Sequence, residues 1–150
     1  MKNFKTERSV QAPRSSVWAV LADYQNIADW NDGVVKSRPI GDATEGLGAQ
    51  RHVELEGSVS MRETVTEWAP EEKMVITIDQ MKKVPVKEAT MTFTLSDGGD
   101  ATPTTMSYDF EPKGGPFGFV VVAMLGRPMS KGFNGFIDCL ERAARARSAA

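Results

Sequence analysis

Arg51 and Glu63 are the residues whose types and spacing best suit chemistry. Side chains alternate between the two faces of a strand, and each of these charges falls on the apolar face of its predicted strand. A three-residue loop at 56–58 would place Arg51 directly opposite Glu63. The apolar residues of matching parity are Ala49, Val53 and Leu55 on the first strand, and Val59, Met61 and Val65 on the second.

Such an inward-facing pair has two interpretations. It could orient a carboxylate, hydroxyl or carbonyl group of a ligand, or Glu63 could supply acid–base chemistry with Arg51 stabilising an enolate. Alternatively, the two charges form a core ion pair that satisfies itself and has no ligand role. The sequence leaves both open.

Tyr108 is the third candidate, because it alternates with apolar residues on the last predicted strand. Its phenol could donate to a ligand carbonyl or assist an enolisation, although a buried tyrosine commonly finds only a backbone partner. Glu63, Arg51 and Tyr108 are therefore the candidate catalytic residues. The residues predicted to line a ligand site are Arg51, Met61, Glu63, Met91, Phe93, Met106, Tyr108, Met124 and Phe133.

The remaining reactive side chains are few. His52, the only histidine, has the opposite parity from Arg51 and is predicted to face outward, and Cys139 has no Cys or His neighbour at metal-ligand spacing. We predict no metal site and no cofactor. The glycine pairs at 98–99 and 114–115 lack the strand-to-helix context of a phosphate loop, which argues against nucleotide binding.

Composition narrows the classes further. The 150 residues carry a formal charge of -2, which lacks the basic excess typical of nucleic-acid binding. A lone cysteine suits a reducing cytoplasm. The first ten residues lack a signal-peptide core, and the apolar run 117–125 is far shorter than the roughly 20 residues of a membrane span. The oligomeric state is not indicated.

The elements that would position these residues follow from periodicity and turn chemistry. Short connections between consecutive strands predict an antiparallel meander, and one α+β domain over 1–150 accounts for the whole chain. A kink or break is expected at Pro128 within the last helix. We predict strands at 4–10, 34–41, 48–56, 58–68, 74–80, 87–96 and 102–112, a helix over 13–23 with further turns to residue 30, and a long helix from 117.

This order of elements resembles the helix-grip superfamily of START-related and birch-pollen-allergen-like proteins. The resemblance is carried by APRSSVWAVLAD at 12–23, Trp30, RETVTEW at 62–68 and EPKGG at 111–115. Within the superfamily the chain is most similar to the bacterial polyketide cyclase/dehydrase and lipid-transport group. The resemblance implies a curved seven-stranded antiparallel sheet around a long C-terminal helix, two short helices after the first strand, and an apolar cavity between sheet and helix.

Our leading hypothesis is the binding or transport of a hydrophobic small molecule, such as a lipid, isoprenoid or polyketide-like compound, with Arg51 and Glu63 as the polar anchor. A polyketide cyclase or dehydratase using the same pocket is the enzyme alternative. The third hypothesis is an interaction module that docks through the segment 117–125.

Overall fold

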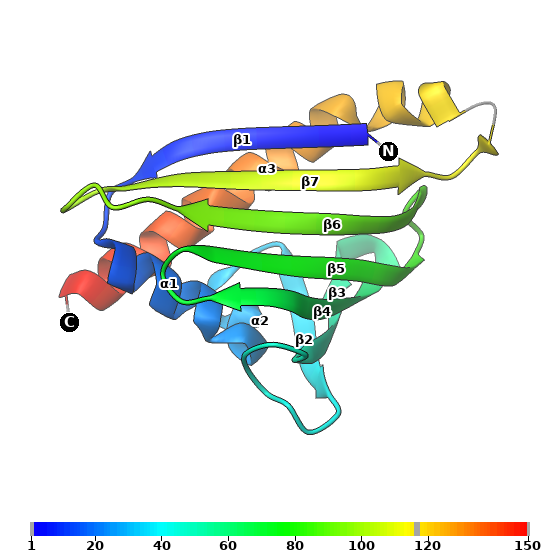
Figure 1. Cartoon of the computed structure of the whole chain (residues 1–150). Coiled ribbons are helices and arrows are strands. Elements are labelled where there is room, and N and C mark those ends of the chain that lie inside the picture. Colours follow the sequence, from blue (N-terminus) through cyan, green and yellow to red (C-terminus); the bar gives the residue numbers. More distant parts are fainter. Residues whose placement is uncertain (1, 116–117, 150) are drawn as a thin grey trace.

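The computed structural model of the protein, shown in Figure 1, is built from one antiparallel sheet and one long helix. It describes residues 2–115 and 118–149, with the backbone alone for 118–127. Its elements are β1 (Lys2–Val10), α1 (Arg14–Ala22), the 3-10 turn η1 (Tyr24–Asn26), α2 (Ile27–Trp30), β2 (Val34–Ile40), β3 (Gln50–Leu55), the 3-10 turn η2 (Glu56–Ser58), β4 (Val59–Ala69), β5 (Lys73–Lys82), β6 (Val86–Leu95), β7 (Thr102–Pro112) and α3 (Gly118–Ala149).

The described strands form a seven-stranded sheet in the order β1-β7-β6-β5-β4-β3-β2. Strands β2 to β7 follow one another by short turns, and β1 pairs with β7 at one edge. The pairing shifts register near Val34 in β2 and at two places in β4, and such bulges bend a strand and increase its twist. The predicted meander and the α+β fold class are confirmed, and β2 and β3 curl behind the front strands in Figure 1.

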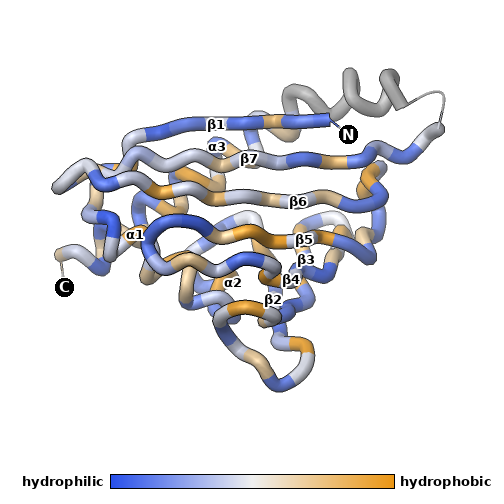
Figure 2. Tube along the Cα trace, in the orientation of Figure 1, coloured by the Kyte–Doolittle hydropathy of each residue, from blue (hydrophilic) through white to orange (hydrophobic). Residues whose placement is uncertain are grey.

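The core lies between the concave face of the sheet and α3, which crosses behind the strands in Figure 1. Apolar and polar residues alternate along the strands, as the hydropathy colours of Figure 2 show. Phe93 and Ile76 from the sheet are fully buried, as are Ile137 and Leu140 from α3. Period-two burial on the strands and helical burial on α3 therefore meet in one apolar layer.

The segment after β1 closes one end of this layer. Pro13 adopts an extended conformation immediately before α1, which suits a residue that fixes its own φ and carries no N–H to satisfy. Val17, Val20 and Leu21 then face the core at helical spacing. Trp18 meets Trp68 of β4 edge to face, with ring centroids 5.2 Å apart.

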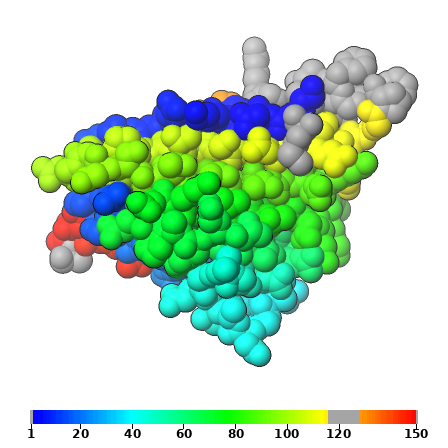
Figure 3. Space-filling view, in the orientation of Figure 1, coloured from blue at the N-terminus to red at the C-terminus, as the bar shows by residue number. Residues whose placement is uncertain are grey.

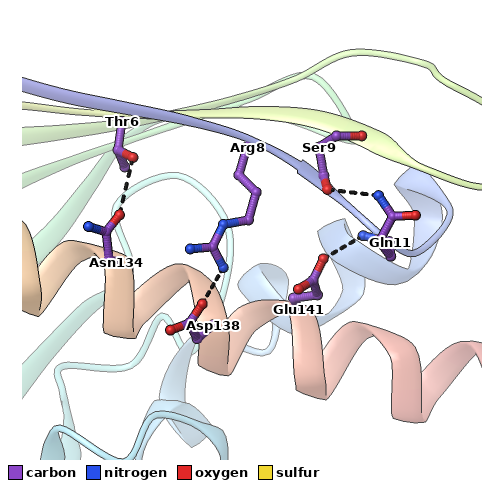
Figure 4. Close-up of polar contacts among 7 residues, drawn as sticks. All are labelled: Thr6, Arg8, Ser9, Gln11, Asn134, Asp138 and Glu141. Carbon is purple, nitrogen blue, oxygen red and sulfur yellow. Dashed lines mark hydrogen bonds and ion pairs between the residues drawn. The ribbon is translucent and has the colours of Figure 1, made fainter.

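Polar contacts fix the C-terminal half of α3 along β1 (Figure 4). The Arg8 guanidinium pairs with Asp138, and the backbone N–H of Gln11 donates to Glu141 at 2.8 Å. On the other side of the helix, Arg142 and Arg147 pair with acidic residues near α2 and at the end of α1. These contacts hold the helix across the open side of the sheet.

The helix α3 runs through Pro128 as one element, so the break that the sequence allowed there does not occur. Among the described residues, no helix is both long and apolar enough to span a bilayer. The convex face of the sheet is open, and the loop between β2 and β3 projects from it at the bottom of Figure 3.

Candidate functional site

A cavity of about 450 Å³ lies between the concave face of the sheet and α3. Its wall is almost entirely apolar, and Asn31, Glu63 and Tyr108 are the only polar side chains among its described lining residues. The rest of the lining is Ile27, Gly33, Val34, Val53, Leu55, Val59, Met61, Ile78, Met81, Val84, Val86, Met91, Pro128, Met129, Gly132, Phe133 and Phe136.

Arg51 and Glu63 form the buried ion pair that the sequence predicted. The two residues are directly opposite on β3 and β4, as the three-residue connection 56–58 requires. Arg51 Nε and Nη2 lie 2.6 and 2.5 Å from Glu63 Oε2, and the two side chains are 5% and 9% exposed. A charge-assisted contact of this kind compensates part of the cost of burying both charges.

Arg51 is also held from the side away from Glu63. Its Nη1 donates to the backbone carbonyl of Tyr24, and its guanidinium carbon lies 3.8 Å from the centre of the Tyr24 ring. All three guanidinium nitrogens therefore have a protein partner, and the ring adds a cation–π contact. Arg51 is not among the lining residues of the cavity, whereas Glu63 is.

The ion pair is consequently one-sided towards the cavity. Both Arg51 nitrogens contact Glu63 Oε2, and no described residue donates a hydrogen bond to Oε1. Since Glu63 lines the cavity, Oε1 is the oxygen left to accept from a ligand. The arginine orients this carboxylate and does not itself line the wall.

Tyr108 and Asn31 supply the other polar groups of the wall. The Tyr108 hydroxyl has no hydrogen-bond partner among the described residues, and its ring contacts that of Phe133 at 4.9 Å. Asn31 Oδ1 accepts from the backbone N–H of Gly33 at 3.0 Å, while its Nδ2 has no described partner. Each group therefore keeps hydrogen-bonding capacity for a ligand.

Sequence reasoning placed five of its nine proposed ligand-binding residues in this wall: Met61, Glu63, Met91, Tyr108 and Phe133. Arg51 lies behind Glu63, and Phe93 and Met106 are buried without lining the cavity. Phe93 instead stacks on Phe136, with ring centroids 5.4 Å apart. Met124 lies outside the described side chains, as does the segment 117–125. The ligand roles of these residues remain predictions.

The sequence analysis missed Asn31 and the β5–β6 connection. Asn31 stands in the run Asn31-Asp32-Gly33, which looks like an ordinary turn, and its 8% exposure has no local signal. Val84 and Val86 flank Pro85 in a segment that served only as a strand separator. Their apolar character was the one available hint.

The other reactive side chains lie apart from the cavity wall. His52 has its side chain 24% exposed, and its Nδ1 is 3.8 Å from Glu54. Cys139 is a buried free thiol on α3. Within the part of the chain that the structure describes, no three His, Cys, Asp or Glu residues gather as they would around a metal ion.

The two tyrosines of the chain predict a loss of stability in alkali. Burial and, secondarily, the Glu63 carboxylate raise the pKa of Tyr108 from 10.0 to about 12, and burial also raises the pKa of Tyr24. Above pH 10 the unfolded chain therefore loses its phenol protons before the native one does. We expect the free energy of unfolding to fall between pH 10 and pH 12, by up to about 1.4 kcal/mol per pH unit for each tyrosine.

Urea unfolding over this pH interval measures the effect, with Tyr108→Phe as the matched variant. The variant lacks one of the two titrating phenols, so its stability should fall less steeply than that of the wild type. Parallel curves for the two proteins would show that Tyr108 titrates alike in both states.

The open curved sheet, the long helix gripped by it and the apolar cavity between them define a helix-grip protein of the START-related class. The chain belongs to the family described as polyketide cyclase / dehydrase and lipid transport, whose family model matches residues 1–145. The family resemblance found in the sequence is thereby confirmed. No curated protein matches the chain.

Solved structures of similar fold come from several sources. The Zhui aromatase/cyclase from Streptomyces sp. R1128 has a TM-score of 0.81 at 16% identity, covering 97% of this chain and 94% of its own. The protein TTHA0849 from Thermus thermophilus has 0.80 at 17%, covering 98% and 99%. Ara h 8.0201 has 0.75 at 11%, covering 97% and 98%. At these identities the similarity is one of fold.

Proposed function

We propose that the protein is a single ligand-binding domain that holds one hydrophobic small molecule in the cavity between its sheet and α3, as a carrier does. The observation that carries this proposal is an apolar space of about 450 Å³ whose described wall has three polar groups with unused hydrogen-bonding capacity. Its size lies within the roughly 300–1,000 Å³ of ligand pockets. Lipids, isoprenoids and polyketide-like compounds match its chemistry.

The packing around the cavity supports this proposal. Protein interiors are normally close-packed, and an empty space of this size lowers stability because its lining forfeits contacts. Phe93, Ile78 and Met74 on the same sheet are buried as tightly as a core allows, so the space is local to one end of the layer. Family membership points the same way, because the family combines cyclases, dehydrases and lipid-transport proteins.

Titration with Nile red, a neutral apolar dye, tests the proposal. We expect saturable binding with one dye per chain and a fluorescence increase as the dye leaves water. The absence of saturable binding would show that the space does not accept ligands.

Gly132 offers a variant that should block the cavity. It lines the space from α3, and a Cβ atom added there meets no other atom within 4 Å. Gly132→Leu should weaken Nile red binding by at least about tenfold, because the new side chain takes up ligand space, while the helix gains propensity. Gly135→Leu is the matched control on the same helix, since Gly135 has equal room but does not line the cavity. Equal losses in both variants would contradict the assignment.

A cyclase or dehydratase is the second candidate function, favoured by a carboxylate that stands alone in an apolar wall. Glu63 could act as base or acid there, with Tyr108 assisting. Glu63→Gln keeps the shape and removes the titrating group, so under this hypothesis it should abolish turnover of a polyketide-like substrate while Nile red still binds. Under the carrier hypothesis the wild type has no turnover. The docking hypothesis for 117–125 concerns residues outside the described part of the chain.

A further inference from the structure

We propose that the cavity selects neutral, hydroxyl-bearing apolar molecules, such as alcohols and phenols, over carboxylates of the same shape. This inference rests on the proposed binding function and names the chemical class of its ligand. It follows from which groups of the ion pair and of the polar wall reach the cavity.

The charge that reaches the cavity is negative. Glu63 is the only charged residue among the described lining residues. Arg51 lies behind it, with its nitrogens engaged by Glu63 and by the carbonyl of Tyr24. A ligand carboxylate would therefore meet a like charge across an apolar space, where repulsion is weakly screened. It would also give up its hydration without a described cation in the wall to replace it.

A ligand hydroxyl meets the same wall favourably. Its O–H can donate to Glu63 Oε1, which no described residue occupies, and a hydrogen bond to an ionised acceptor is stronger than a neutral one. Asn31 Nδ2 can donate to a ligand oxygen, because Oδ1 is already used by Gly33. The Tyr108 hydroxyl can do either. A carboxylate ion offers no proton to Glu63, so it gains none of the first contact.

Competition against bound Nile red at neutral pH tests the inference with three compounds of one ring system. 2-Naphthol carries a hydroxyl, 2-naphthoate carries a charge, and methyl 2-naphthoate carries neither a charge nor a donor. We expect 2-naphthol to displace the dye at the lowest concentration and 2-naphthoate to require at least about tenfold more, with the ester between them.

Removing the charge should remove much of the selectivity. In Glu63→Gln the ratio between 2-naphthoate and 2-naphthol should shrink by at least about fivefold. Because that variant leaves Arg51 with a weaker partner, Arg51→Met combined with Glu63→Met is a second charge-free variant with an apolar core. Tyr108→Phe keeps the carboxylate and should keep the discrimination against 2-naphthoate. Thermal melting establishes that each variant is folded.

The outcomes separate the two proposals. If Nile red does not bind, the binding function fails and the ligand class fails with it. If Nile red binds and 2-naphthoate competes as well as 2-naphthol does, only the ligand class is overturned. A preference that is unchanged in both charge-free variants also overturns it, because the selectivity would not then come from Glu63.

Discussion

Glu63→Ala is expected to lower the free energy of unfolding by about 3–5 kcal/mol, because it leaves the Arg51 guanidinium buried without its counter-charge. The arginine side chain is 5% exposed and cannot reach water without moving the strand or the Tyr24 ring above it. Its remaining contact, with the Tyr24 carbonyl, is to a neutral acceptor. Chemical denaturation of the two proteins measures the difference.

The matched control is the double variant Arg51→Met with Glu63→Met, which replaces the pair by apolar side chains. We expect it to lose much less stability than Glu63→Ala, since neither charge is then buried. Arg62 and Asp79 form a second pair, on β4 and β5, with side chains 31% and 36% exposed. Removing that surface partner through Asp79→Ala should cost about 1 kcal/mol or less. Equal losses for Glu63→Ala and the double variant would contradict a desolvated pair.

Phe93→Ala is expected to cost about 3–5 kcal/mol, the usual penalty for truncating a fully buried aromatic residue. Phe93 is 1% exposed and stacks on Phe136, so its removal leaves a void inside a packed layer. Denaturation with urea gives the free energy, and an unchanged slope would show that the unfolded state is not altered.

Met91 is the control for this prediction, because it lies two residues away on the same face of β6. It borders the cavity and is 9% exposed, so its side chain already has fewer packed neighbours to lose. Met91→Ala should cost about 2 kcal/mol, the low end for such a truncation. It should change the affinity for Nile red, whereas Phe93→Ala should affect it less. A cost as large as that of Phe93→Ala would mean that the cavity closes in solution.

The sheet, its register and the inward direction of the ion pair could be predicted from the sequence. These are local properties: side chains alternate with period two, and the three residues 56–58 set which residues of β3 and β4 are opposite. Arg51 and Glu63 could therefore be paired from parity and loop length alone. The same reasoning placed Tyr108 and Met91 on the concave face.

Which of the inward side chains line a cavity, and which are core, depends on the packing of the helices and became visible in the folded chain. Parity states that Phe93 and Met91 share a face, but where α3 crosses that face decides that one stacks on Phe136 and the other borders open space. The Tyr24 carbonyl, 27 positions from Arg51 in the chain, turns the arginine away and leaves Glu63 at the wall. Contacts between segments so far apart depend on how the helices fold over the sheet, and no local period or turn signal encodes that.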